Sequence, residues 1–148
     1  MQLLCRKALI VVSIVSIGVL AACHDASGPP GLSANYMLVS VNGQPLPAII
    51  SPVPEAPTVL DGTLFLDGSG NALVREHERV MIAPGDVTYL TNYTYTIAGN
   101  KIQFHIDCPI NASCIRPPTG TFVGSHLLID MSGGANIVVY DYMLVMPD

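Results

Sequence analysis

Apolar and polar residues alternate with a period of two over much of the chain from Tyr36 onward, which predicts β-strands. The clearest case is 101–107, where Ile102, Phe104 and Ile106 alternate with polar neighbours. Similar segments recur, most of them followed by a turn signal such as Asn42-Gly43. The expected strands are 36–41, 63–66, 72–83, 87–97, 101–107, 119–123, 126–131 and 137–145.

About eight short strands with frequent turns predict an all-β, antiparallel fold, either a barrel or, as the alternative, a β-sandwich. Segment 72–83 is the ambiguous element, because its pattern also suits a helix. We expect a strand there, since the segment leaves a Gly-rich turn and another strand follows soon after.

The first 22 residues have the pattern of an export signal rather than of folded structure. Arg6 and Lys7 precede the apolar run 8–20, which is shorter than the about 20 residues that span a membrane. Leu20-Ala21-Ala22-Cys23 resembles the lipobox of bacterial lipoproteins. In that family the signal is removed just before the cysteine, which receives a diacylglycerol.

The lipobox resemblance implies a protein anchored to a membrane of the cell envelope through a lipid on Cys23. His24 follows the cysteine in place of aspartate, which favours the outer membrane, on its periplasmic or surface side. An ordinary signal with an accidental cysteine is the alternative. Two or three acyl chains would make the anchor stable.

Beyond the signal, composition divides the chain into a tether and one domain. Residues 23–35 are rich in Gly, Pro and Ser and lack periodicity, so we expect a flexible tether. Residues 36–148 form the expected barrel domain. Of the six Lys and Arg residues, two leave with the signal, and four remain against eleven Asp and Glu. No basic patch remains, so nucleic acid is not an expected partner.

Two cysteines, Cys108 and Cys114, remain in the expected domain. An exported protein folds under oxidising conditions, so we expect a disulfide between them. The closed loop is short, and its stabilisation is therefore only roughly 2 kcal/mol.

The strand and turn motifs of the domain are similar to those of small lipocalin-like lipoproteins of environmental bacteria. They are Tyr36-x-Leu38-x-Ser40-Val41-Asn42-Gly43-x-Pro45-Leu46-Pro47, Tyr95-Thr96-Ile97-x-Gly99-Asn100-x-Ile102-x-Phe104 and Gly120-x-Phe122-x-Gly124-x-x-Leu127-x-Ile129. The resemblance implies an eight-stranded up-and-down barrel. It supplies no functional residues, because these motifs specify a fold rather than a chemistry.

A calcium-binding loop is one hypothesis for residues 67–78. Asp67, Ser69, Asn71 and Glu78 fall at ligand positions of such a loop. Ala72 stands where the sharp turn requires glycine, however. The competing interpretation is a hairpin turn made by Asp-Gly-Ser-Gly and followed by a charged strand.

The run 75–79 concentrates charge, with Glu76 and Glu78 on one face if the segment is a strand. A pair of catalytic carboxylates is one hypothesis, but alternating charges are more typical of a solvated edge strand. His105 with the two cysteines suggests a soft metal site only if the thiols stay reduced. His105 and His126 are expected at the surface. No motif for a catalytic nucleophile is present.

Aromatic residues on the expected inward faces are Tyr89, Tyr93, Tyr95, Phe104, Tyr140 and Tyr142. They either line a cavity for a small amphipathic ligand or simply fill the core. We therefore expect a binding or structural module that is not an enzyme and uses no cofactor. The ligand hypothesis competes with docking of another envelope protein, for instance on the apolar, Pro-rich loop 49–57.

Overall fold

The computed structural model describes residues 33–53, 55–81, 85–107, 116–132 and 137–146. The expected signal, Cys23, most of the tether, Cys108 and Cys114 lie outside these residues. The ten strands are β1 (Ala34–Val41), β2 (Gln44–Pro45), β3 (Ala48–Ile49), β4 (Thr58–Leu66), β5 (Asn71–Arg79), β6 (Asp86–Ala98), β7 (Lys101–His105), β8 (Thr119–Val123), β9 (His126–Asp130) and β10 (Val139–Val145). The described residues contain no helix long and apolar enough to cross a membrane.

The strands close into an eight-stranded antiparallel up-and-down barrel. From β4 to β10 each strand pairs with the next along the chain, and β1 pairs with both β10 and β4. This double pairing of β1 closes the barrel, while β2 and β3 are short additions to it. The predicted all-β barrel is confirmed, and the β-sandwich alternative is not what forms.

The ambiguous segment is a strand, β5, which ends at Arg79. Its neighbour β4 begins at Thr58, five residues earlier than its sequence pattern predicted. The register between β4 and β5 shifts between Val59 and Asp61. Such a bulge interrupts the alternation, so the first half of β4 was not recognisable from the sequence.

The two ends of the barrel differ in their connections. Tight turns join β4 to β5, β6 to β7 and β8 to β9, and β1 enters at this same end. The opposite end, called here the loop end, carries the longer connections 42–57, 80–85, 106–118 and 131–138. The predicted Asn42-Gly43 turn is present, with φ of 51° and 75°, the left-handed values that such hairpins require.

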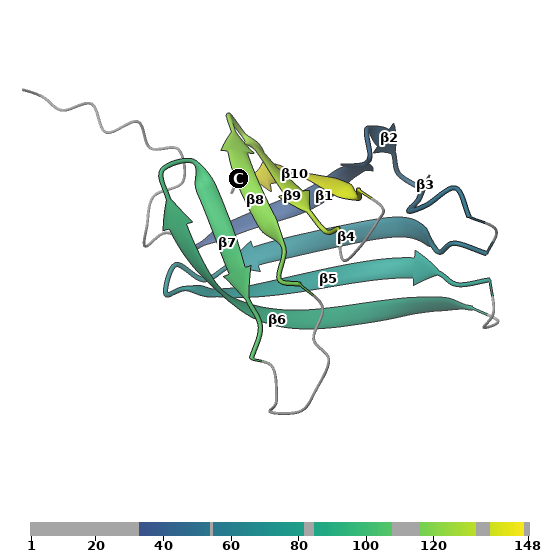
Figure 1. Cartoon of the computed structure of the whole chain (residues 1–148), viewed down its shortest axis with the longest axis horizontal. Helices are drawn as coiled ribbons and strands as arrows, with labels where there is room; N and C mark the ends of the chain where they lie inside the picture. Colours follow the sequence, from purple (N-terminus) through teal and green to yellow (C-terminus); the bar gives the residue numbers. More distant parts are fainter. Residues whose placement is uncertain (1–32, 54, 82–84, 108–115, 133–136, 147–148) are drawn as a thin grey trace, which may run out of the picture.

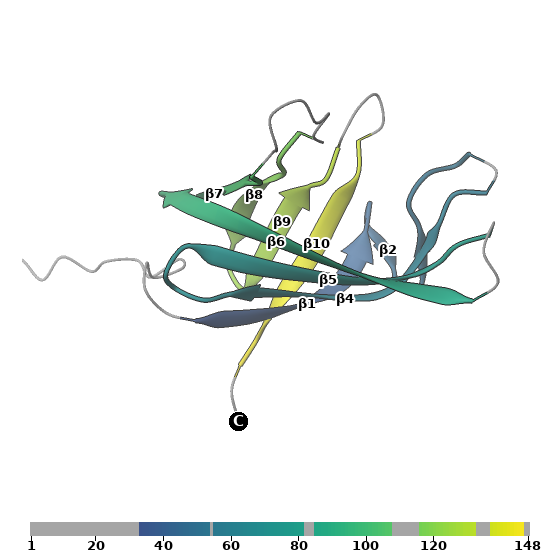
Figure 2. The ribbon, with the colours of Figure 1, turned by 90° about the horizontal axis from the view of Figure 1, so that it is seen from below.

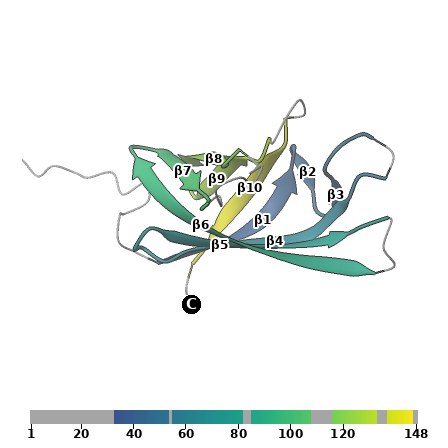
Figure 3. The ribbon, with the colours of Figure 1, turned by 60° about the horizontal axis from the view of Figure 1, so that its bottom comes forward.

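The long strands β4, β5 and β6 lie side by side, and β7 to β9 cross over one part of them (Figures 1 and 3). Figure 2 shows the β5–β6 hairpin extending past β7 to β10 at the end where Arg79 and Asp86 lie. The barrel interior is mostly apolar. Its fully buried large side chains are Tyr142, Phe104, Leu64, Ile102, Leu127, Ile129, Val41 and Val59.

Candidate functional site

Two glutamates of β5 face into the barrel. Ala72 and Val74 are buried on the inward face of this strand, and Glu76 and Glu78 continue the same alternation. Glu78 is 8% exposed and is the one buried charged residue in the described part of the chain. Glu76 is half-buried, and its Oε1 atom is fully buried with no hydrogen-bond partner.

This arrangement corrects the interpretation of 75–79 as a solvated edge strand. β5 lies between β4 and β6 and pairs with both along its length. A shift of one residue would turn Ala72 and Val74 outward and bring the arginines inside, so burial of the apolar pair fixes the register. The alternation that starts at Ala72 is the sequence signal that could have revealed the inward glutamates.

The basic residues of β5 project from the outer surface, where aspartates hold them. Arg75 Nη1 donates a hydrogen bond to Asp61 Oδ1 over 2.8 Å, and His77 Nδ1 lies 2.8 Å from Asp61 Oδ2. Arg79 Nε donates to Asp86 Oδ1 over 3.0 Å. Hydrogen bonding to His77, supported by Arg75, lowers the pKa of Asp61. Arg75 and Arg79 therefore have partners outside the barrel and do not neutralise the glutamates inside.

The bulge in β4 makes this division possible. It turns Asp61 outward, while Val59 and Gly62 both face inward. Gly62 is opposite Glu76 in the register, and a Cβ atom on Gly62 would lie 3.1 Å from Leu38 Cδ2. The Leu38 side chain therefore packs directly against the backbone of Gly62, in the space that a side chain at this position would need.

Two tyrosines of β10 complete what we call the carboxylate cluster, which consists of Glu76, Glu78, Tyr140 and Tyr142. The two rings have centroids 6.2 Å apart, and Tyr142 is 0% exposed. Tyr142 is opposite Leu38 in the register of β1 and β10, and Leu38 packs against Gly62. Gly62 in turn is opposite Glu76, so the two tyrosines and the glutamates of β5 lie on the same side of the interior. The Tyr142 hydroxyl is buried and has no hydrogen-bond partner.

Burial and mutual repulsion govern the protonation of the cluster. Burial raises the pKa of the Glu76 carboxyl, and the charge of Glu78 raises it further, while the hydroxyl of Tyr140 acts in the opposite direction as a hydrogen-bond donor. Burial also raises the pKa of Glu78. The pKa values of Tyr140 and Tyr142 are raised, first by burial and then by the charge of Glu76. The environment thus disfavours negative charge at every member.

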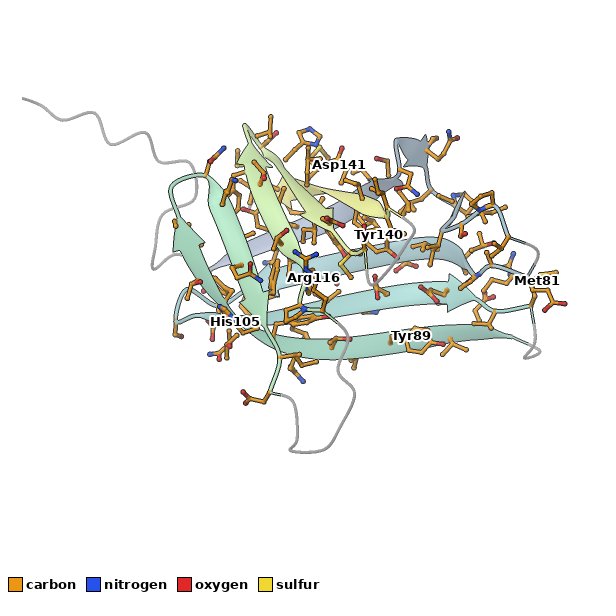
Figure 4. The ribbon with its side chains drawn as sticks, viewed as in Figure 1. Met81, Tyr89, His105, Arg116, Tyr140 and Asp141 are labelled. Carbon is orange, nitrogen blue, oxygen red and sulfur yellow. The ribbon has the colours of Figure 1, made fainter. Side chains whose placement is uncertain are left out.

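The cluster lies beside an open part of the wall. Tyr89 of β6 is directly opposite Glu76 in the register and is 45% exposed (Figure 4). β7 pairs with β6 only from Thr94 onward, so among the described residues 86–93 have β5 as their single neighbouring strand. A hollow of about 400 Å³ lies farther along β6, between Tyr93 and Ile106, and no member of the carboxylate cluster lines it.

The predicted ligand-lining residues thus occupy three different settings. Tyr140 and Tyr142 belong to the carboxylate cluster. Tyr93 packs edge-on against the buried Phe104, with centroids 5.6 Å apart, and Tyr95 is half-buried opposite Phe104. Tyr89 was expected to be enclosed, but β6 extends beyond the strands that would cover it, and its ring borders solvent.

The four predicted calcium ligands do not come together. Asp67 accepts hydrogen bonds from the backbone N–H groups of Ser69 and Asn71 and from Asn71 Nδ2, over 2.7–2.9 Å. These bonds, foremost those from Asn71, lower the pKa of Asp67 to about 2. Glu78 lies seven residues farther along β5, about 23 Å from Asn71 at an extended rise per residue.

The segment 67–70 is accordingly a hydrogen-bonded turn, as the competing interpretation held. No group of three His, Cys, Asp or Glu residues placed to hold a metal ion occurs in the described ranges.

The three histidines within the described residues lie on the outer surface. His126 Nδ1 is 2.8 Å from Asp141 Oδ1, and His105 Nε2 is 3.4 Å from Thr96 Oγ1. At the loop end, Ile50 packs against the core, whereas Ile49 and Val53 are exposed. The loop 49–57 therefore covers part of the barrel end and still presents apolar side chains to solvent.

Comparison with known proteins adds no family to this description. No protein-family model matches the chain, and neither a curated protein nor a solved structure is significantly similar to it. What is established is the eight-stranded antiparallel barrel with its internal carboxylate cluster.

Proposed function

We propose that this chain is a lipocalin-like lipoprotein of the cell envelope, anchored through a lipid on Cys23, whose barrel binds a small amphipathic molecule. The protein acts by binding and not by catalysis. The described chain enters the barrel at the tight-turn end, where β1 begins, so the loop end lies opposite this entry point.

One observation carries the proposal: the interior holds polar atoms that the described residues leave without partners. Glu76 Oε1 and the Tyr142 hydroxyl are both buried and unpaired. A barrel that merely filled its core would bury apolar groups there, because an unpaired buried polar group costs about 1–3 kcal/mol. Polar atoms surrounded by apolar walls are typical of a ligand site.

The position of the open wall supports the same proposal. Thr91 faces inward between Tyr89 and Tyr93, on the part of β6 that lacks a second neighbouring strand. A ligand entering there would reach Glu76 with its polar end. The apolar side chains beyond, Leu38 and Leu64, would contact its hydrocarbon part.

A blocked entrance tests the proposal. The full chain, purified in an uncharged detergent at constant concentration, is titrated calorimetrically with octyl-chain probes. Thr91→Trp places a large ring at the open wall and is expected to weaken binding at least about tenfold. Thr88→Trp, on the outer face of the same strand, is the matched control and should bind like the parent. Equal binding by all three proteins, or no binding of any octyl probe, contradicts the proposal.

A second candidate function is docking of another envelope protein at the loop end. It is favoured by Ile49 and Val53, which are 60% and 54% exposed. Photo-crosslinking from position 53 in intact cells tests it. A covalent adduct with one envelope protein supports docking, and a chain that stays uncrosslinked contradicts it.

A further inference from the structure

In the part of the chain that the structure describes, no cationic side chain belongs to the carboxylate cluster. The described Lys, Arg and His residues are all outside the buried set, and those of β5 are held by Asp61 and Asp86. The titratable groups that face the glutamates from other strands are tyrosines, which carry no positive charge. They are Tyr89 and Tyr93 of β6 and Tyr140 and Tyr142 of β10.

A buried carboxylate pair without a counter-charge is destabilising unless something else neutralises it. Protonation lessens this cost, and burial favours it because it raises the pKa of both glutamates. A bound cation would serve equally well. The unpartnered hydroxyl of Tyr142, on a side chain that is 0% exposed, is a separate sign of a missing polar group.

The surroundings favour an organic cation over a metal ion. Calcium requires roughly six to eight oxygen ligands, whereas Val59, Leu38 and Val41 line the interior near the cluster. Tyrosine ring faces attract organic ammonium groups by cation–π interaction. An anionic headgroup would be repelled by the two carboxylates.

We propose that the molecule bound by this barrel carries a cationic amine, held by the Glu76 and Glu78 carboxylates with the hydroxyls and ring faces of Tyr140 and Tyr142. This inference rests on the proposed function and names the chemical class of its ligand. The amine donates charge-assisted hydrogen bonds to both carboxylates, and the alkyl part lies against the apolar wall.

Three probes of equal chain length separate charge from hydrophobicity. The full chain in an uncharged detergent is titrated at neutral pH with octylamine, octanol and octanoate. We expect octylamine to bind at least about tenfold more tightly than octanol, and octanoate to bind most weakly. In Glu76→Gln/Glu78→Gln, octylamine binding should weaken by about 10- to 100-fold while octanol binding stays unchanged.

Glu55→Gln is the matched control, because Glu55 is an exposed glutamate of the loop 49–57. It should leave all three affinities unchanged, and a thermal melt confirms that each variant is folded. If the probes bind without regard to charge, or if the double variant keeps its preference for octylamine, the cationic ligand is refuted while a general amphipathic ligand survives. If no probe binds, both proposals fall.

Discussion

The two sides of the barrel interior differ in kind. The wall made by β7, β8 and β9 contributes only apolar groups, and its inward residues are Ile102, Phe104, Gly120, Phe122, Leu127 and Ile129. β5 and β10, separated by β4 and β1, contribute Glu76, Glu78, Tyr140 and Tyr142. Close packing of apolar side chains in the first wall raises the free energy of unfolding. The buried polar groups of the second wall lower it. This contrast is the basis of the proposal that the barrel binds a ligand.

The largest expected effect lies in the apolar wall. Phe104 is 1% exposed and packs against Tyr93, so Phe104→Ala should reduce the free energy of unfolding by about 3–5 kcal/mol. Phe65→Ala on the outer face of β4 is the control and should cost clearly less. Urea denaturation measures both. Similar losses for the two variants would show that β7 to β9 do not form the packed side.

The carboxylate cluster should behave in the opposite way. Because the pKa of Glu76 is raised in the folded state, its contribution to stability is complete below the unfolded value of 4.5 and is lost as pH rises through the folded pKa. The melting temperature should therefore decline from about pH 4.5 toward neutral. Glu76→Gln should flatten this decline and stabilise the protein by about 1 kcal/mol or more at neutral pH.

Glu78 adds to this slope in the same direction, since its pKa is also raised. Differential scanning calorimetry across that pH range measures the effect, with Glu55→Gln as the reference. A variant that is less stable than the parent at neutral pH would mean that the Glu76 carboxylate is well satisfied inside the barrel.

The smallest effect is expected from the charges outside. Asp61 pairs with Arg75 and His77, but these side chains remain substantially exposed, so Asp61→Asn should cost below about 1 kcal/mol at neutral pH. The pKa of Asp61 is lowered, and its contribution is therefore lost as pH falls below about 3.8. A loss comparable to that of Phe104→Ala in the same urea experiment would contradict a solvated outer network.

The sequence predicted the barrel because alternation and turn chemistry are local. Asn42-Gly43 forms its turn, and the strand 119–123 has its expected bounds. The sequence does not predict the cluster, because a charged run such as 75–79 is typical of an exposed strand. The inward direction of Glu76 and Glu78 follows only from the alternation that begins at Ala72 and Val74. The bulge before Asp61 and the extension of β6 past its neighbours depend on pairing between strands, which one strand's pattern does not contain.

The inward orientation of the two glutamates is the claim on which the rest depends. Carboxyl ¹³C chemical shifts of the labelled full chain, followed through a pH titration, report the protonation of each glutamate separately. Glu76 and Glu78 should both titrate above 4.5, and the two curves should be coupled because their charges interact. If both titrate independently at or below 4.5, their carboxylates are in water, and the internal cluster does not exist.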